Sequence, residues 1–452
     1  MPLTVLNPAT EEPIAKLEQA GIEETDAAVV RAKAVFPVWR DVTPADRSRL
    51  LRRVATLVED HAEELAQIES RNVGKPIAGA RGEIGMVAQV FHFYAGAIDK
   101  HYGDTIPVAG GVAATFREPL GVVGLIVPWN FPLNIASWKL GPALACGNTV
   151  VLKPAELTPL SALRLAELVL EAGIPEGVVN VLVGKGSIVG QRLIEHPDVA
   201  KIGFTGSTEV GRLVMQGAAA TIKRVTLELG GKSANVVFAD ADLERAAAAA
   251  PYAVFDNAGQ DCCARSRILV QKTVYDRFLH ELVTATRGVK VGDPADDSTE
   301  MGPLISAAHR ETVSSFLDDS VDVAFRGEVP EGAGFWFPCT VVEATNDDRI
   351  AREEVFGPVV AVIPFEGEAD AIRIANDTPF GLSGSIWTRD GARALRVARA
   401  LETGVLSVNS NSSVRVSTPF GGFKQSGFGR ELGMQALDGY SELKSVFIST
   451  EG

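Results

Sequence analysis

The chain has 452 residues, of which 46% are hydrophobic and 22% charged, values ordinary for a globular protein of two or three domains. Acidic residues outnumber basic ones by 57 to 43, and the net charge of −14 argues against nucleic acid or an anionic membrane as the main partner. Four cysteines without a C-x-x-C pair argue against a disulfide framework, and Met1–Ala15 lacks the layout of a signal peptide. Both observations predict a cytoplasmic location.

The first hundred residues are predicted to be mainly helical, because apolar side chains recur at helical spacing in Pro44–Asp60 and Ala78–Lys100. In Thr105–Pro119, two short β-prone runs flank the pair Gly110-Gly111, which predicts a hairpin. The uncharged stretch Gly121–Trp138 contains two prolines and two asparagines. A strand, a loop and a helix fit that stretch better than a membrane span.

Strands and helices alternate from this point onward. The predicted elements are strands at Gly121–Val127, Asn148–Leu152, Val178–Val183, Lys201–Phe204 and Arg224–Leu229, with helices at Pro132–Ala145, Pro159–Ala172, Ser187–His196 and Thr208–Ala219. A second series follows, with strands Ala234–Phe238 and Ile268–Val270 around a helix at Leu243–Asn257. Successive β-α-β units predict mostly parallel, doubly wound sheets. The composition shift at Leu229-Gly230-Gly231-Lys232 predicts a hinge between two domains.

Two glycine-rich stretches follow strands and open helices, as phosphate-binding turns do. One contains Gly184, Gly186 and Gly190, and the other contains Gly206 and Gly211. Glycine lets the backbone approach a phosphate, and a helix N-terminus offers free N–H groups. Neither stretch is a G-x-G-x-x-G or Walker motif, so tight turns explain each one equally well.

Five polar side chains are candidates for chemistry because each follows a buried strand or helix. Cys262 follows an apolar helix and is a candidate thiol nucleophile, with a buried core cysteine as the alternative. Glu228 ends a strand and is a candidate base, and Asn130 is a candidate oxyanion donor. Lys153 and Glu156 follow a third strand and could hold a ribose. Ligands bind at the carboxyl ends of such strands, so their coincidence favours a site.

The motifs that carry these residues are those of a known family. They are Pro128-Trp129-Asn130-Phe131-Pro132, Lys153-Pro154-Ala155-Glu156, Gly203-Phe204-Thr205-Gly206-Ser207, Leu227-Glu228-Leu229-Gly230-Gly231-Lys232, Gly259-Gln260-Asp261-Cys262, Glu354-Val355-Phe356-Gly357-Pro358 and Pro419-Phe420-Gly421-Gly422-Phe423-Lys424. In this order the chain resembles the NAD(P)-dependent aldehyde dehydrogenase superfamily of the hydrolytic type, over nearly its whole length.

The resemblance implies a role for each catalytic candidate. Cys262 would be the nucleophile, Glu228 would activate the hydrolytic water, and Asn130 with the Cys262 backbone N–H would form the oxyanion hole. The cofactor would be NAD, with NADP as a second possibility, and no metal is required. The implied cofactor-binding residues are Trp129, Lys153, Glu156, Gly206, Ser207, Leu229, Glu354 and Phe356.

The resemblance also implies an α/β fold with two doubly wound domains and a small β element for oligomerisation. The dinucleotide-binding domain would comprise residues 1–102 and 120–230, and the catalytic domain residues 231–425. Residues 103–119 and 426–452 would form the oligomerisation element of a homodimer or homotetramer.

The aldehyde is the least determined feature. The implied channel residues are Phe131, Trp138, Asp256, Asp261, Arg415 and Phe420. Two acids and three aromatic rings favour an aminoaldehyde such as γ-aminobutyraldehyde, whereas Arg415 favours succinate semialdehyde. A broad specificity, a CoA-acylating enzyme and a non-catalytic protein of the same fold are further alternatives. The presence of Glu228 argues against the CoA-acylating type, and the retention of Cys262, Glu228 and Asn130 argues against a non-catalytic protein.

Overall fold

The computed structural model describes residues 2–451, and its first sheet has six strands in the order β19-β9-β8-β5-β6-β7. Neighbouring strands run parallel, except that β19 pairs antiparallel with β9. Both faces of such a sheet are covered, which explains why the central strands consist of buried, mostly uncharged residues. The strands are β5 (Val122–Ile126), β6 (Thr149–Lys153), β7 (Val179–Val181), β8 (Val199–Thr205), β9 (Arg224–Glu228) and β19 (Gly427–Phe428).

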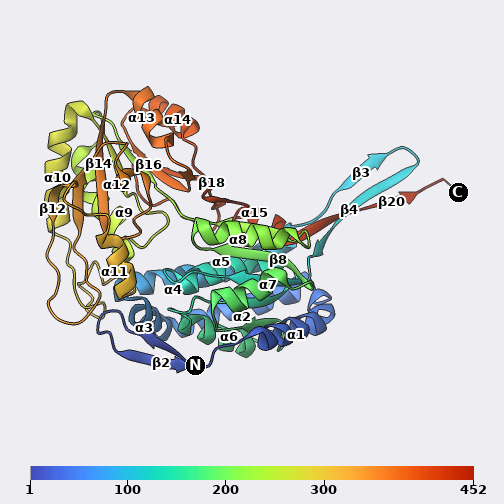
Figure 1. Cartoon of the computed structure of the whole chain (residues 1–452). Coiled ribbons are helices and arrows are strands. Elements are labelled where there is room, and N and C mark those ends of the chain that lie inside the picture. Colours follow the sequence, from blue (N-terminus) through green and yellow to red (C-terminus); the bar gives the residue numbers. More distant parts are fainter. Residues whose placement is uncertain (1, 452) are drawn as a thin grey trace.

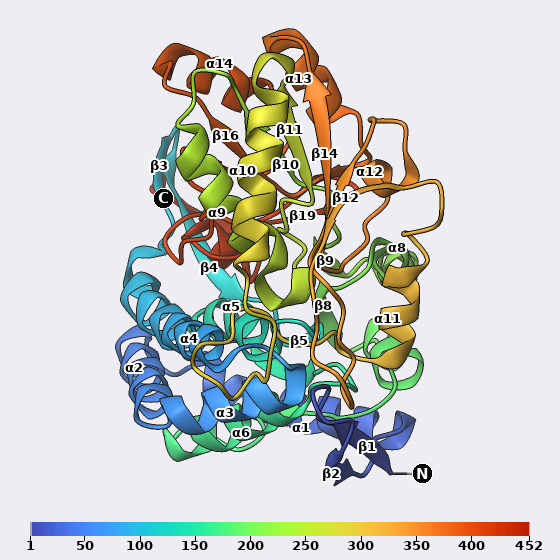
Figure 2. The same ribbon diagram turned by 90° about the vertical axis from the view of Figure 1, so that its left-hand side faces the viewer.

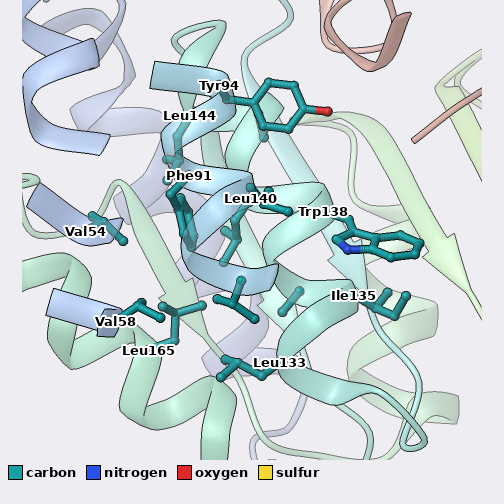
Figure 3. Packing of buried hydrophobic residues seen from close by; sticks show 14 of the residues in the cluster. Val54, Val58, Phe91, Tyr94, Leu133, Ile135, Trp138, Leu140, Leu144 and Leu165 are labelled. Atoms are coloured by element: carbon teal, nitrogen blue, oxygen red, sulfur yellow. The ribbon is translucent and has the colours of Figure 1, made fainter. Parts of the chain in front are cut away.

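Eight helices surround this sheet in the lower half of Figures 1 and 2. They are α1 (Ile22–Arg40), α2 (Pro44–Asp60), α3 (Ala62–Val73), α4 (Ile77–Ala97), α5 (Pro132–Ala145), α6 (Leu160–Glu171), α7 (Gln191–Glu195) and α8 (Thr208–Ala219). Phe91 and Tyr94 of α4 pack with Leu140 and Leu144 of α5 in one buried cluster, shown in Figure 3. All 14 residues of α5 are buried, so this helix and its N-terminal loop are held from every side.

The second sheet has seven strands in the order β12-β13-β14-β11-β10-β16-β17, and only β12 is antiparallel to its neighbour. It forms the upper domain in Figure 2. Its strands are β10 (Ala234–Val237), β11 (Arg267–Gln271), β12 (Asp322–Arg326), β13 (Thr340–Glu343), β14 (Val359–Phe365), β16 (Ser383–Trp387) and β17 (Val405–Val408). Its helices are α9 (Leu243–Phe255), α10 (Tyr275–Arg287), α11 (Ala307–Ser314), α12 (Arg349–Arg352), α13 (Glu368–Asn376) and α14 (Gly391–Ala400).

A three-stranded antiparallel sheet projects from the body as an arm (Figure 1). It consists of β3 (Thr105–Val108), β4 (Gly111–Pro119) and the C-terminal strand β20 (Ser441–Ser449). Gly110 has a φ of +75° in the turn between β3 and β4, where the sequence predicts the hairpin. Phe116 is 48% exposed and Phe447 is 56% exposed, so the arm carries large apolar side chains on its surface.

Short elements complete the fold. They are the pair β1 (Leu3–Leu6) and β2 (Pro13–Leu17), the pair β15 (Phe380–Gly381) and β18 (Phe423–Lys424), a π-helical turn at Gly186–Gly190, and α15 (Gln435–Asp438). Within residues 426–451, β20 lies in the arm whereas β19 extends the six-stranded sheet. No described helix has the length and apolar character that a membrane crossing needs.

Most predicted elements agree with the structure within one or two residues, and α5 and α8 agree at both ends. Two predicted helices differ from the observed ones. The helix predicted at Ser187–His196 is a π-helical turn followed by α7. The helix predicted at Leu243–Asn257 ends at Phe255, because Asn257 and Ala258 take positive φ angles of 49° and 56°.

Candidate active site

The loop that carries Cys262 leaves α9 through three successive residues with positive φ: Asn257, Ala258 and Gly259. A side chain at Gly259 would collide with the carbonyl group of Gly357, so this position requires glycine. Left-handed backbone of this kind is costly and persists only where the surroundings hold it. We call residues 256–265 the nucleophile loop.

Asn130, from the loop between β5 and α5, holds the nucleophile loop in place. Its Nδ2 donates to the carbonyl oxygen of Gln260 at 2.8 Å, and its own carbonyl accepts from Asn257 Nδ2 at 2.9 Å. Gln260 in turn accepts at Oε1 from the backbone N–H of Ile305 at 2.9 Å. Asn130 is 5% exposed, and its amide group carries a second N–H that can donate to an oxyanion.

Cys262 is partly buried at the wall of a cavity of about 600 Å³. Its sulfur, that of Cys263 and a carboxylate oxygen of Asp261 lie within 4.8 Å of one another. A hydrogen bond with the Cys263 thiol and burial raise the pKa of Cys262 well above its usual value. The thiolate is the reactive form, so this thiol needs a base or a nearby cation to become a nucleophile.

Glu228 ends β9 and is 4% exposed, so this strand-end acid is buried and not solvated. Neither carboxylate oxygen has a hydrogen-bond partner among residues 2–451. Burial is the main reason that the pKa of this carboxyl is raised well above its ordinary value, and the charge of Glu431 adds to the effect. A buried carboxylate with free oxygens is suited to hold and deprotonate a water molecule.

The connection after Glu228 reaches the nucleophile loop. A side chain at Gly231 would collide with the carbonyl oxygen of Cys262, which explains the glycine at this hinge. The backbone N–H of Gly231 donates to Oε1 of Glu354 at 2.8 Å. Burial raises the pKa of Glu354 to about 7.

Lys153 and Glu156 follow β6, which is separated from β9 by β8 and β5 in the same sheet. Lys153 is 4% exposed, its Nζ donates to the carbonyl of Pro154 at 3.0 Å, and burial lowers its pKa. Glu156 accepts at Oε1 from the backbone N–H of Gly186 at 2.9 Å, which links it to the first of the two glycine-rich stretches. The predicted ribose-binding pair therefore lies beside that stretch.

The second glycine-rich stretch forms the N-terminus of α8. Ser207 is the N-cap residue, and its hydroxyl accepts from the backbone N–H of Val210 at 3.3 Å. Gly206 donates to the backbone carbonyl of Glu228, and Leu229 packs against α8 at Gly211. The buried hydroxyl of Thr205 has no hydrogen-bond partner in the described chain. Free N–H groups at this helix start can receive a pyrophosphate.

Trp129 and Phe356 meet edge to face, with their ring centroids 5.4 Å apart. His309 of α11 completes this aromatic group, 5.4 Å from Trp129, and its Nε2 bonds to the carbonyl oxygen of Phe356 at 2.7 Å. Phe356 has a φ of +54°, so the histidine supports a strained backbone position. The sequence pattern around His309 does not indicate this role, because its partners come from segments far apart in the chain.

Phe131, Trp138 and Phe420 line the cavity in front of Cys262, as expected for an aldehyde channel. The rings of Trp138 and Phe420 meet edge to face at 5.1 Å. The indole N–H of Trp138 donates to Asn134 Oδ1 at 3.0 Å, which fixes the ring in its buried position. Figure 3 shows Trp138 on the side of α5 that faces away from Phe91.

Three carboxyl groups lie along the same wall: Asp256, Asp261 and Glu83 of α4. Burial and the charge of Asp261 raise the pKa of Asp256 to about 6. Glu83 forms a salt bridge of 2.6 Å with buried Lys75, whose ammonium lies 4.4 Å from the ring centre of Phe131. Glu83 was not predicted, because its place at the cavity depends on how α4 packs in the fold.

The prediction for Arg415 differs from the structure. Its side chain is exposed and folds back onto its own loop, where Nη1 donates to Ser412 Oγ at 2.8 Å and to the carbonyl of Val414 at 2.7 Å. The arginine among the cavity-lining residues is Arg265, three residues after Cys262. Positive charge therefore enters the cavity wall from the nucleophile loop and not from the loop before Phe420.

Comparisons with known proteins agree with this geometry. The aldehyde dehydrogenase family pattern matches residues 1–446. An aldehyde dehydrogenase of Aspergillus niger is 45% identical over 449 residues, which cover 98% of this chain and 90% of that protein. The betaine aldehyde dehydrogenase of Bacillus subtilis (strain 168) is 41% identical over 461 residues, which cover 99% of this chain and 94% of that protein.

A solved structure matches over the whole chain as well. The crystal structure of PnpE in complex with nicotinamide adenine dinucleotide, a protein from Pseudomonas sp. WBC-3, has a TM-score of 0.98 and 44% identity. The match covers 100% of this chain and 95% of PnpE. These comparisons confirm the fold class and enzyme class predicted from the sequence. The chain belongs to the aldehyde dehydrogenase family.

Proposed function

We propose that this enzyme oxidises an aldehyde to a carboxylate with NAD as hydride acceptor, through a covalent intermediate on Cys262 that water then hydrolyses. The observation that carries the proposal is Glu228, a buried carboxylate whose two oxygens have no partner among the described residues. The glycine hinge that follows it packs against the backbone carbonyl of Cys262. A hydrolytic enzyme needs such a base, whereas transfer of the acyl group to CoA does not.

Each step has a group suited to it. The Cys262 thiolate adds to the aldehyde carbon and forms a thiohemiacetal. Its oxyanion would accept a hydrogen bond from the side-chain amide of Asn130. Bound NAD supplies the acceptor for the hydride that leaves this carbon. Glu228 then removes a proton from water as it attacks the thioester, and the carboxylic acid is released from Cys262.

The residues around the two glycine-rich stretches fit a dinucleotide. Lys153 and Glu156 would hold the adenosine ribose, and the N-terminus of α8 at Gly206 and Ser207 would hold the pyrophosphate. Leu229 would line this path, Glu354 would hold the nicotinamide ribose, and Trp129 and Phe356 would pack beside it. The unpartnered hydroxyl of Thr205 in this segment supports the assignment.

One assay tests the reaction. NADH formation is followed at 340 nm with a simple aldehyde, in the presence and in the absence of CoA, and the product is identified by mass spectrometry. We expect turnover without CoA and a free carboxylate as the product. Turnover that requires CoA would replace the hydrolytic proposal by the acylating one, and no turnover with a broad aldehyde panel would support the non-catalytic alternative.

We expect the enzyme to prefer NAD over NADP. The carboxylate of Glu156 would accept from ribose hydroxyls and would repel a 2′-phosphate. The measurement is kcat/KM for both cofactors at saturating aldehyde, with Glu156→Gln as the matched variant. In Glu156→Gln, the kcat/KM with NAD divided by that with NADP should be smaller than in the parent enzyme. A preference of the parent enzyme for NADP would contradict the role given to Glu156.

We further propose a substrate with a cationic end, such as an ω-aminoaldehyde. Asp256, Asp261 and Glu83 lie along the wall of the channel, and the three aromatic rings also attract cations. Lys75 forms a salt bridge with Glu83, and the positive charge of Arg265 interacts with Asp261, which leaves Asp256 as the carboxyl group available to a cationic end. Succinate semialdehyde is the alternative, but the arginine that favoured it in the sequence analysis is exposed and pairs with its own loop.

The preference for a cationic aldehyde should depend on pH. Asp256 has a raised pKa of about 6, so it is charged above pH 6 and neutral below. We expect the kcat/KM ratio of γ-aminobutyraldehyde to butyraldehyde to fall about tenfold between pH 8 and pH 5. Taking the ratio of two aldehydes cancels the ionisation of the catalytic groups. Asp256→Asn should give a low ratio at all pH values, while Arg415→Gln should behave like the parent; equal ratios in parent and Asp256→Asn would contradict the proposal.

The exposed apolar side chains of the arm support a further proposal, a homodimer or homotetramer held through β3, β4 and β20. We also propose that, beside this arm, residues 1–102 and 120–230 form the dinucleotide-binding domain and residues 231–425 form the catalytic domain with the nucleophile. The four cysteines are free, which suits the cytoplasm that we propose as the location.

A further inference from the structure

Arg265 is a buried cation three residues after the nucleophile. It is 3% exposed and lines the same cavity as Cys262. Its Nη1 donates to the carbonyl of Cys263, and its Nη2 donates to Ser413 Oγ at 2.9 Å and to the carbonyl of Asn411 at 3.3 Å. All these acceptors are neutral oxygens, so no bonded carboxylate cancels the positive charge. Burying a cation in this way is costly unless nearby negative charge offsets it, and the ionised forms of Asp261, Cys262 and Cys263 would supply such charge.

The hydrogen bonds join two walls of the active site. The backbone N–H of Arg265 is bonded to Ala253 of α9, and its side chain reaches the segment 411–414, which lines the cavity opposite. Ser413 also meets the hydroxyl of Ser383, at the start of β16, at 3.3 Å. Arg265 therefore bonds to α9 through its backbone, and its side chain joins the nucleophile loop to Ser413, which in turn meets β16.

Arg265 places a positive charge among the acidic groups around the Cys262 thiol. The groups that face the Cys262 thiol are Cys263 and Asp261 on its own loop, and Glu354 from the segment before β14; all three raise the pKa of Cys262. Arg265 interacts favourably with the ionised forms of Cys262, Cys263 and Asp261. Its positive charge is opposite in sign to the charges of Asp261 and Glu354.

We propose that Arg265 is a positioning residue of this active site: it ties the nucleophile loop to the 411–414 segment, and its charge favours the thiolate form of Cys262. The inference rests on the cysteine chemistry of the proposed function. In this proposal, the positive charge of Arg265 opposes the acidic neighbours that otherwise keep the Cys262 thiol protonated.

The test is the rate at which iodoacetamide alkylates Cys262 as a function of pH, read by peptide mass spectrometry on the cofactor-free enzyme. Alkylation follows the thiolate fraction and needs no turnover. We expect Arg265→Gln to move the profile upward by about one pH unit, which lowers the rate at pH 7 about tenfold. Arg265→Lys keeps the charge, and Ser413→Ala removes only the tether, so both should keep the parent profile.

An unchanged profile in Arg265→Gln, or an equal shift in Arg265→Lys, would overturn the role of the charge. If Arg265→Gln does not fold, Arg265→Met takes its place, because an apolar side chain of similar length fills the same buried volume without a charge. The result is separate from the proposed function. A parent enzyme without dehydrogenase turnover would refute the proposed function. The alkylation profile would still decide whether the charge of Arg265 favours the Cys262 thiolate.

Discussion

Replacing Cys262 by alanine is expected to abolish NADH formation, with a loss of at least about 10⁴ in kcat, as removal of a nucleophile does in other covalent enzymes. The neighbouring thiol cannot take over. Cys263 is 8% exposed and packs with the apolar core, and its backbone N–H donates to Asp261 Oδ1 at 2.8 Å. Its thiol is hydrogen-bonded to that of Cys262 and is the more deeply buried of the two.

The matched control is Cys263→Ala, which should retain most of the activity. It removes the thiol whose hydrogen bond raises the pKa of Cys262, so the thiolate forms more easily in this variant. NAD binding, followed by quenching of tryptophan fluorescence, should be the same in both variants and in the parent. A dead Cys263 variant beside an active Cys262 variant would show that the nucleophile has been assigned to the wrong thiol.

Glu228→Gln is expected to separate the two halves of the reaction. The amide keeps the shape of the side chain but cannot accept a proton, so the thioester forms and is hydrolysed slowly. Loss of a positioned general base typically costs about 10²–10⁴ in rate. Rapid mixing should therefore show a burst of NADH equal to the enzyme concentration, followed by very slow turnover, and mass spectrometry should detect the acyl group on the peptide that contains Cys262.

The pH profile gives a second readout for Glu228. The raised pKa means that the carboxyl is protonated at low pH and becomes a base only as the pH rises. The hydrolysis rate of the parent should therefore increase toward alkaline pH, and the slow rate in Glu228→Gln should lose this dependence. Glu431→Gln is an instructive companion, because removing its charge should lower the pKa of Glu228 and shift the profile toward acid. Turnover at the parent rate in Glu228→Gln would remove this residue from the mechanism.

The order of strands and helices could be predicted because each depends on the local pattern of apolar residues. The bounds of α5 agree since Pro132 starts it and Gly147 follows it. The end of α9 could not be predicted, because Asn257 leaves the helix to bond the backbone carbonyl of Asn130, a contact with a distant part of the chain. Local propensity contains no information about such partners.

The same distinction applies to the site. Cys262, Glu228 and Asn130 stand in motifs with recognisable neighbours, so their roles could be proposed from the sequence. Glu83 belongs to a helix whose distance from the nucleophile depends on the packing of α4 against α5. The direction of Arg415 depends on two acceptors within its own loop, and no pattern of residue types reveals that choice.

The pairing of β19 with β9 has a consequence for synthesis on the ribosome. Gly427 pairs with Glu228, Gly421 packs against its carboxylate, and Phe420 lines the channel. The nucleophile and the base are thus translated long before the last strands that enclose them. Because domains fold from the N-terminus during synthesis, the catalytic pair stays open to water until the final segment has emerged. A chain released before residue 420 would contain every catalytic group and would still lack the segment that packs against Glu228 and lines the channel.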